Sequence, residues 1–265
     1  MINSYHTHTA FCKHAEGSVE DYVKKAIELN LSEIGITDHV PVPDYFYDDE
    51  EFKRINLRTK MDYAQIDEYL LEIERAKLKY KDQIKIYSGF ECEYYDKLIP
   101  VLMELKDKVD YLNFGLHHFY YDGKLNNSFG NLEFIKYYGI TACKALDSKL
   151  FTIFVHPDLF LYSYRDKPFD KLAEEVTRDM CEAAVRNNVY LEINCNKLRD
   201  WLNYGRKFAY PNEDFWKIVS EYKDIKVVIG SDAHKPEYVY DEAVEYAYEW
   251  GKKLNLNIVS KIDIK

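Results

Sequence analysis

The chain has 265 residues, a length typical of a single α/β barrel, and its hydrophobic content of 47% can fill a substantial core. Its formal net charge of −10 disfavours a nucleic-acid-binding surface, because phosphate contacts need clustered Lys and Arg. No signal peptide and no apolar run long enough for a membrane span are evident, and the five scattered cysteines are typical of reduced thiols. We therefore expect a cytoplasmic protein that binds neither nucleic acid nor membranes.

Apolar, strand-like runs alternate with amphipathic helical patterns along the whole chain. Strands are expected at 2–8, 33–39, 84–94, 111–119, 151–157, 190–196 and 225–234. Helices are expected near 18–30, 62–80, 97–108, 131–148, 168–188, 212–223 and 237–253, and Ser18 with Asp21 predicts a capping box at the first. Strict alternation favours a parallel sheet with helices outside it, either a barrel or an open sheet. The long segment 40–60 is interpreted either as a lid or as a surface excursion.

Two doublets of polar residues mark the first and the last predicted strand. His6 and His8 close the first run, and Asp232 and His234 close the last. Residues at i and i+2 of a strand point to the same face, so each doublet directs two metal-competent groups into one space. Imidazole nitrogens and carboxylate oxygens suit Zn, Mn or Fe.

The other histidines follow the same pattern. Seven of the eight histidines end strand-like runs, and only His14 lies beyond one, in a loop that can still reach the strand ends. In a barrel the carboxyl ends of all strands form one ring, whereas an open sheet gathers only those at its switch point. We therefore predict one domain, residues 1–265, folded as a distorted seven-stranded β/α barrel with a metal-dependent active site.

Three neighbouring pairs leave a choice. Adjacent strand residues face opposite sides, so at most one of His117 and His118 points into the barrel from regular structure. Asp38, beside His39, is interpreted as a structural residue rather than a ligand. Glu91 and its neighbour two residues on, Glu93, share a parity, so either could face inward.

Several strings, in a fixed order, resemble the motifs of the PHP (polymerase and histidinol phosphatase) family. They are HTHTAFCKH, ITDH, GFECEY, GLHHF, VHPDLF, LEINCNKLR and GSDAH. The resemblance runs from residue 2 to about residue 240 and is closest to the histidinol-phosphate phosphatase branch. It implies a distorted seven-stranded barrel that holds up to three divalent ions, with Zn, Mn and Fe all suitable.

The resemblance also implies how the ligands are divided. One metal is assigned to His6, His8, Asp232 and Glu91. Glu91 is expected to bridge to a second metal, whose other ligands are His118 and His156; His118 is chosen over His117 because it directly precedes Phe119. His14, His39 and His234 are assigned to a third.

The implied activity is hydrolysis of L-histidinol phosphate to L-histidinol and phosphate, a step of histidine biosynthesis. A hydroxide that bridges two metals would attack phosphorus in line, and Asp232 could relay a proton. Seven neutral imidazoles and two carboxylates around three divalent ions leave a charge of about +4, which can hold a phosphate dianion in an acidic protein.

Candidate substrate residues come from their positions near the strand ends. Arg199 is expected to clamp the phosphate with two parallel hydrogen bonds, with Asn194 and Arg165 as weaker candidates. Candidates for the substrate ammonium and imidazole are Asp44, Glu93, Asp158, Tyr45, Phe46 and Phe119.

Two other functions remain open at this stage. The same site could serve a PHP-type phosphoesterase that acts on small nucleotides or a DNA 3′ end. A non-catalytic, metal-stabilised module is the other alternative, which the full ligand set disfavours. The sequence indicates neither the oligomeric state nor the proton donor to the leaving group.

Overall fold

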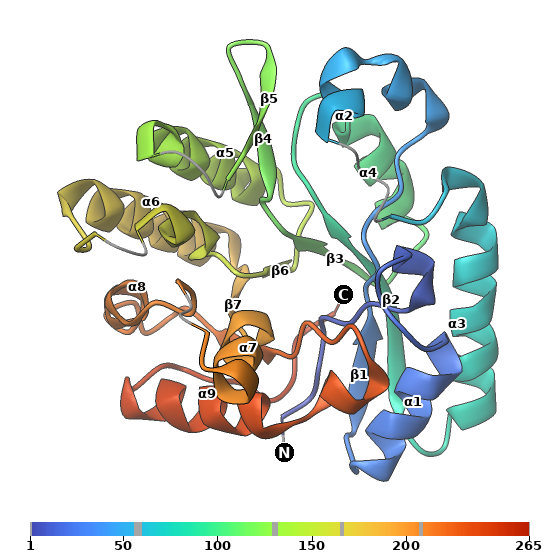
Figure 1. Ribbon diagram of the computed structural model, residues 1–265. Helices are drawn as coiled ribbons and strands as arrows, with labels where there is room; N and C mark the ends of the chain where they lie inside the picture. The colour runs from blue at the N-terminus through green and yellow to red at the C-terminus, as the bar shows by residue number, and fades with distance from the viewer. Residues whose placement is uncertain (1, 56–59, 129–131, 165–166, 207–208, 265) are drawn as a thin grey trace.

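Six parallel strands form one curled sheet, a half-barrel with helices outside it (Figure 1). The computed structural model describes the chain except residues 1, 56–59, 129–131, 165–166, 207–208 and 265. The strands follow the order β1-β2-β3-β6-β7-β8. Their bounds are Glu33–Ile36 (β1), Lys85–Cys92 (β2), Tyr111–Phe114 (β3), Ile153–Phe154 (β6), Tyr190–Asn194 (β7) and Val227–Gly230 (β8).

The N-terminal segment connects the two outer strands of this sheet. Ser4 forms a parallel bridge with Ile34 of β1, and Thr7 forms one with Ala233, just beyond β8. The backbone amide of His8 also donates to the carbonyl of Ala233 at 2.8 Å. Because the segment changes partner after a few residues, no regular ladder forms, and the described residues place six strands in this sheet instead of the seven expected.

The expected strand 111–119 is interrupted. β3 ends at Phe114, and the chain turns before β4 (His118–Tyr121), which pairs with β5 (Lys124–Asn127) as an antiparallel hairpin that projects from the sheet (Figure 1). The turn breaks the in-and-out alternation of a continuous strand. Strand parity across this region therefore could not decide which neighbouring histidine faces the centre.

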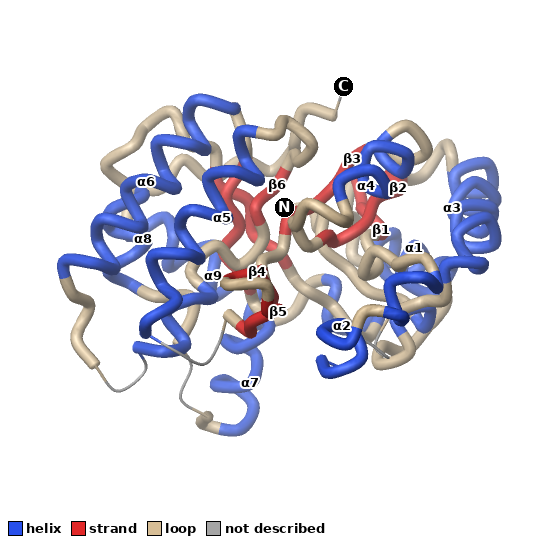
Figure 2. The backbone as a smooth tube through the Cα atoms, turned by 90° about the horizontal axis from the view of Figure 1, so that it is seen from above, coloured by secondary structure: helices blue, strands red, loops and turns tan. Residues whose placement is uncertain are grey.

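Seven helices match the expected ones. They are Val19–Glu28 (α1), Ile66–Tyr80 (α3), Ile99–Lys106 (α4), Ile135–Asp147 (α5), Lys171–Asn187 (α6), Glu213–Val219 (α8) and Glu242–Lys253 (α9). The capping box of Ser18 and Asp21 is confirmed. Figure 2 shows the strands in the middle, with α1 and α3 on one side and α5, α6 and α8 on the other.

Two α-helices were not expected, and 3₁₀ turns lie in connections and at the starts of the expected helices 62–80, 131–148 and 237–253. Segment 40–60 contains η2 (Asp44–Asp48) and α2 (Glu50–Ile55), and α7 (Asn196–Tyr204) follows β7 directly. The other 3₁₀ turns are η1 (Ala10–Cys12), η3 (Tyr63–Gln65), η4 (Leu132–Phe134), η5 (Leu159–Tyr164) and η6 (Pro236–Val239). No helix among the described residues combines the length and apolarity needed to cross a bilayer. All five cysteines are free thiols.

Aromatic side chains fill the sheet interior near the starts of the strands. Tyr5, Tyr87, Tyr111 and Tyr190 pack in one buried cluster with Ile262 of the C-terminal segment. The hydroxyl of Tyr111 donates to the carbonyl of Tyr5 at 2.8 Å, which satisfies a buried polar group. Packed side chains therefore fill the end of the described sheet at which its strands start.

The contact between the N-terminal segment and the end of β1 can be tested at Thr37, the residue that follows this strand. Its buried hydroxyl accepts from the amide of Thr7 at 3.1 Å and contacts the carbonyl of Thr7 at 3.3 Å. We expect Thr37→Val to lower the free energy of unfolding by about 1–3 kcal/mol, because it leaves a buried amide without its acceptor. Urea unfolding of the metal-free protein measures this loss.

Thr177→Val is the matched control. Thr177 is as buried as Thr37, but its hydroxyl donates to the carbonyl of Ala173, and both residues belong to the same helix, α6. We expect Thr177→Val to lower the free energy of unfolding less than Thr37→Val does. Equal losses in the two variants would show that the contact of the N-terminal segment contributes no special stability.

Candidate functional site

A cavity of about 590 Å³ lies at the carboxyl ends of the strands. Its walls combine imidazoles, carboxylates, two tyrosines, an amide and one lysine. The lining residues are His14, His39, Glu91, His117, His156, Tyr162, Asn196, Lys197, Tyr210, Asp232 and His234.

Imidazole nitrogens converge below and around this cavity. Nε2 of His6 lies 3.0 Å from Nε2 of His8, and Nε2 of His14 lies 2.9 Å from Nε2 of His234. At most one nitrogen of such a pair can carry a hydrogen toward the other, so at least one lone pair points into the space between them. This arrangement is what a metal ion needs from its ligands.

Fixed acceptors hold the opposite nitrogen of each of these rings. Nδ1 of His6 lies 2.9 Å from a carboxylate oxygen of Glu192. Nδ1 of His14 lies 2.7 Å from the carbonyl of Cys12, and Nδ1 of His8 lies 3.3 Å from the Cys12 sulfur. A ring that donates from Nδ1 leaves Nε2 free to bind a metal, and such partners also fix the ring orientation.

The carboxylate of Glu91 faces two groups of histidines at once. Its Oε1 lies 2.8 Å from Nε2 of His156 and 3.7 Å from Nε2 of His117. Its Oε2 lies 2.9 Å from Nδ1 of His39 and 3.4 Å from Nε2 of both His6 and His8. A carboxylate in this position can bridge two ions.

Protonation differs among the imidazoles: burial opposes a charge on His6 and His117, but Glu192 and Glu93 raise the pKa of these two rings. Burial lowers the pKa of His39 to about 4, so its ring is neutral at neutral pH. Burial opposes the charge on Glu91, but the imidazoles of His39, His6 and His117 hold its pKa well below its ordinary value. Neutral imidazoles around ionised carboxylates are the forms that coordinate divalent ions.

Besides the buried group of His8, Cys12 and Asp38, three groups of side chains bring their ligand atoms within 4.8 Å of one another around the cavity. All three are buried or half-buried, and together they fit divalent ions. They are His6, His8 and Asp232; His8, His39 and His234; and Glu91, His117 and His156.

The structure places His117, not His118, beside Glu91 and His156. Nδ1 of His118 lies 3.4 Å from a carboxylate oxygen of Glu93, and His118 is the first residue of β4. The chain leaves β3 at Phe114, so the rule that places alternate residues on one face does not extend to this pair. The sequence-based choice of His118 thus differs from the geometry.

Glu93, expected to bind substrate, instead supports these histidines. It is buried, and it accepts from the backbone amides of His117 and His118 at 3.0 and 3.1 Å. It also lies 3.1 Å from Nδ1 of His117, which leaves Nε2 of that ring directed toward Glu91.

Asn194 similarly lies behind the ligands. Its side-chain amide donates to Glu192 at 2.8 Å and to Asp232 at 3.2 Å. Glu192, which contacts His6 as well, was not among the predicted site residues; its strand parity with Asn194 was the available signal. A Cβ at Gly230 would lie 2.0 Å from a Glu192 oxygen, so a glycine there makes room for this carboxylate.

Two candidate ligands have left-handed backbone conformations. His156 has φ of 35° and Asp232 has φ of 45°. Such conformations are unfavourable for residues other than glycine and persist where the surroundings impose them, often at functional sites.

Arg199 has other partners than the expected phosphate. Its guanidinium forms an ion pair with Asp241, donates to the carbonyl of Ser231 at 3.0 Å and lies 4.6 Å from the ring centre of Tyr238. The cation of this segment that lines the cavity is Lys197.

The other substrate candidates are dispersed. Phe46 and Phe119 are buried in the core, whereas Tyr45 is 64% exposed and Asp44 is also on the surface. The buried carboxylate of Asp158 accepts from the indole of Trp216 at 3.0 Å and from the amide of Asn212 at 2.7 Å. Burial raises its pKa to about 7. Arg165 lies outside the described residues.

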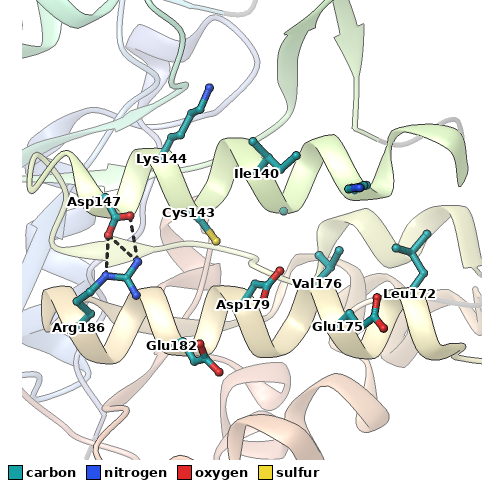
Figure 3. A pocket seen from close by; sticks show the side chains of 12 residues that line it. Ile140, Cys143, Lys144, Asp147, Leu172, Glu175, Val176, Asp179, Glu182 and Arg186 are labelled. Atoms are coloured by element: carbon teal, nitrogen blue, oxygen red, sulfur yellow. Dashed lines mark hydrogen bonds and ion pairs between the residues drawn. The ribbon is translucent and has the colours of Figure 1, made fainter.

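A second cavity, of about 530 Å³, lies between α5 and α6 (Figure 3). Arg186 and Asp147 form an ion pair at one end of it, with an N–O distance of 2.8 Å. The metal-competent groups found among the described residues all lie elsewhere, around the first cavity or directly beneath it. We therefore assign the chemistry to the first cavity.

A family model, that of the PHP domain, matches residues 4–196. The chain belongs to the PHP family. The match includes the first histidine doublet, Glu91 and His156, which the structure brings together, and ends before Asp232 and His234.

Two curated relatives match most of the chain. A protein named probable histidinol-phosphatase from Deinococcus radiodurans is 26% identical over 247 residues, which cover 87% of this chain and 85% of that protein. One of the same name from Schizosaccharomyces pombe is 27% identical over 265 residues, which cover 90% and 82%.

Solved structures show the same PHP fold. A candidate histidinol phosphatase from Listeria monocytogenes has a TM-score of 0.73 at 22% identity, covering 92% of this chain and 99% of that one. The histidinol phosphate phosphatase of Lactococcus lactis, solved with Zn, L-histidinol and phosphate, has a TM-score of 0.69 at 19% identity, covering 99% and 98%.

The choice between the adjacent histidines of this PHP chain is testable. We expect His117→Ala to reduce bound metal and to lower turnover more than about 100-fold, since removing a ligand exceeds the effect of removing a residue that supports one. Metal analysis of the purified protein measures the bound metal, and steady-state release of phosphate from L-histidinol phosphate measures the turnover.

His118→Ala is the matched control, expected to retain its metal and most of its turnover. Loss of metal in His118→Ala, with His117→Ala unaffected, would reverse the assignment.

Proposed function

We propose that this protein is a metal-dependent phosphomonoesterase that hydrolyses L-histidinol phosphate to L-histidinol and phosphate. The proposal rests on the position of the Glu91 carboxylate, which lies between two groups of buried imidazoles. The two curated relatives that match most of the chain, both named probable histidinol-phosphatase, support the choice of substrate.

The ligand groups support a centre of three divalent ions, with Zn, Mn or Fe as candidates. His6, His8 and Asp232 would hold one, with Glu91 shared between it and a second at His117 and His156. His39 and His234 would hold the third, together with His14, whose Nε2 lies 2.9 Å from Nε2 of His234. In this proposal the N-terminal segment is the seventh strand of a distorted barrel.

Bound divalent ions supply a nucleophile from water near neutral pH and neutralise charge on phosphoryl oxygens. The protein's own residues orient the ligands that make this possible. Glu192 holds the ring of His6, Glu93 holds that of His117, and Asn194 fixes the carboxylate of Asp232 at 3.2 Å. Asp232 also lines the cavity, and in this proposal its carboxylate would relay a proton there.

The substrate assignment predicts a ranking of activities. Protein loaded with Zn, Mn or Fe should release phosphate from L-histidinol phosphate at least about 100-fold faster, in kcat/KM, than from nucleoside monophosphates. Asp232→Asn, which keeps the shape but weakens metal binding, is the inactive control. Faster release from nucleotides would contradict the substrate, and full activity of Asp232→Asn would contradict the site.

A further inference from the structure

One cation stands among the described residues that line the cavity. The wall contains two carboxylates, Glu91 and Asp232, together with imidazoles, which are neutral when they bind metals, and Lys197 is its single ammonium group. In a protein of net charge −10, a permanent positive charge at this place is relevant to an anionic ligand.

The backbone of Lys197 is tied to the candidate metal centre. It occupies the first turn of α7, which begins directly after β7. Asn194 connects the two regions, because its side-chain oxygen accepts from the amide of Asn196 at 2.9 Å while its nitrogen donates to Asp232 at 3.2 Å. The start of α7 is therefore held at a fixed position relative to a candidate ligand.

The ammonium of Lys197 is only weakly engaged within the protein. Its side chain is 38% exposed, and Nζ lies 3.5 Å from a carboxylate oxygen of Asp200, three residues further along α7. Exposed pairs of this kind contribute little stability, so a dianion in the cavity can compete for the ammonium.

The neighbouring arginine shows the contrast. Arg199 is buried against Asp241, Tyr238 and the carbonyl of Ser231, and it thereby supports the turn that precedes Asp232. Arg199 therefore forms its contacts inside the fold, whereas Lys197 lines the cavity.

We propose that Lys197 binds the phosphoryl group of the substrate through a charge-assisted hydrogen bond from Nζ. This inference rests on the proposed phosphomonoesterase function. A flexible lysine interacts with phosphate as a point charge in the substrate complex and in the product complex alike. Lys197 therefore acts mainly on affinity for the phosphate group and much less on the rate of the chemical step.

The test measures inorganic phosphate as a competitive inhibitor and as a ligand in calorimetry, with metal-loaded protein. We expect Lys197→Met to raise both the phosphate inhibition constant and KM about tenfold, with kcat changed less than about threefold. Lys197→Arg, which keeps the charge, should restore most of the affinity. Asp200→Asn, which removes the competing carboxylate, should equal or exceed the wild type in phosphate affinity.

Lys171→Met is the control for loss of one positive charge, because Lys171 is 88% exposed on α6; its phosphate affinity should not change. Unchanged phosphate affinity in Lys197→Met would overturn the proposal, and so would a loss of bound metal that accounts for the whole effect. If the wild type hydrolyses no phosphate monoester, the proposed function fails, while calorimetry with phosphate still decides the role of Lys197. If the metal-loaded wild type binds no phosphate, the proposed role of Lys197 is refuted.

Discussion

The carboxylate of Glu91 is 3% exposed, and each of its oxygens faces a different group of imidazoles. Burying an ionised carboxylate is costly unless opposite charge or hydrogen bonds compensate it. Gly115 is part of this arrangement, because a Cβ there would lie 2.3 Å from Oε1. The paths of β2 and of the turn after β3 are thus constrained by the space that one side chain requires.

The same centre explains how an acidic chain can act on an anion. With a net charge of −10, the protein would repel a phosphate monoester at long range. Divalent ions held by neutral imidazoles would reverse the sign locally, and Glu91 and Asp232 each contribute one carboxylate to a single ligand group. Two other carboxylates close to the candidate ligands, Glu93 and Glu192, contact Nδ1 of His117 and of His6, on the side of each ring opposite Nε2.

Much of this arrangement could be predicted from the sequence. The alternation of runs predicted the parallel sheet and seven of its helices, and the doublets at His6 and Asp232 predicted which strand ends meet. These inferences rely on local periodicity, which is set by the backbone geometry of strands and helices. The short helix α7 was missed because it follows β7 without an intervening loop.

Other features depend on contacts that local patterns do not contain. The choice between His117 and His118 depends on where β3 ends, and the role of Arg199 depends on Asp241, 42 residues away. The incomplete strand at the N-terminus has a similar origin, since its two partners, Ile34 and Ala233, lie far apart in the chain. Such outcomes are fixed by tertiary packing, which overrides local preference.

The most direct test of the central claim is a crystal structure of the metal-loaded protein, with anomalous diffraction measured at the absorption edge of the metal. The account predicts two anomalous peaks on opposite sides of the Glu91 carboxylate, each within coordination distance, about 2.0–2.2 Å for Zn, of one of its oxygens. A fully loaded crystal in which Glu91 touches no metal, or only one, would contradict it.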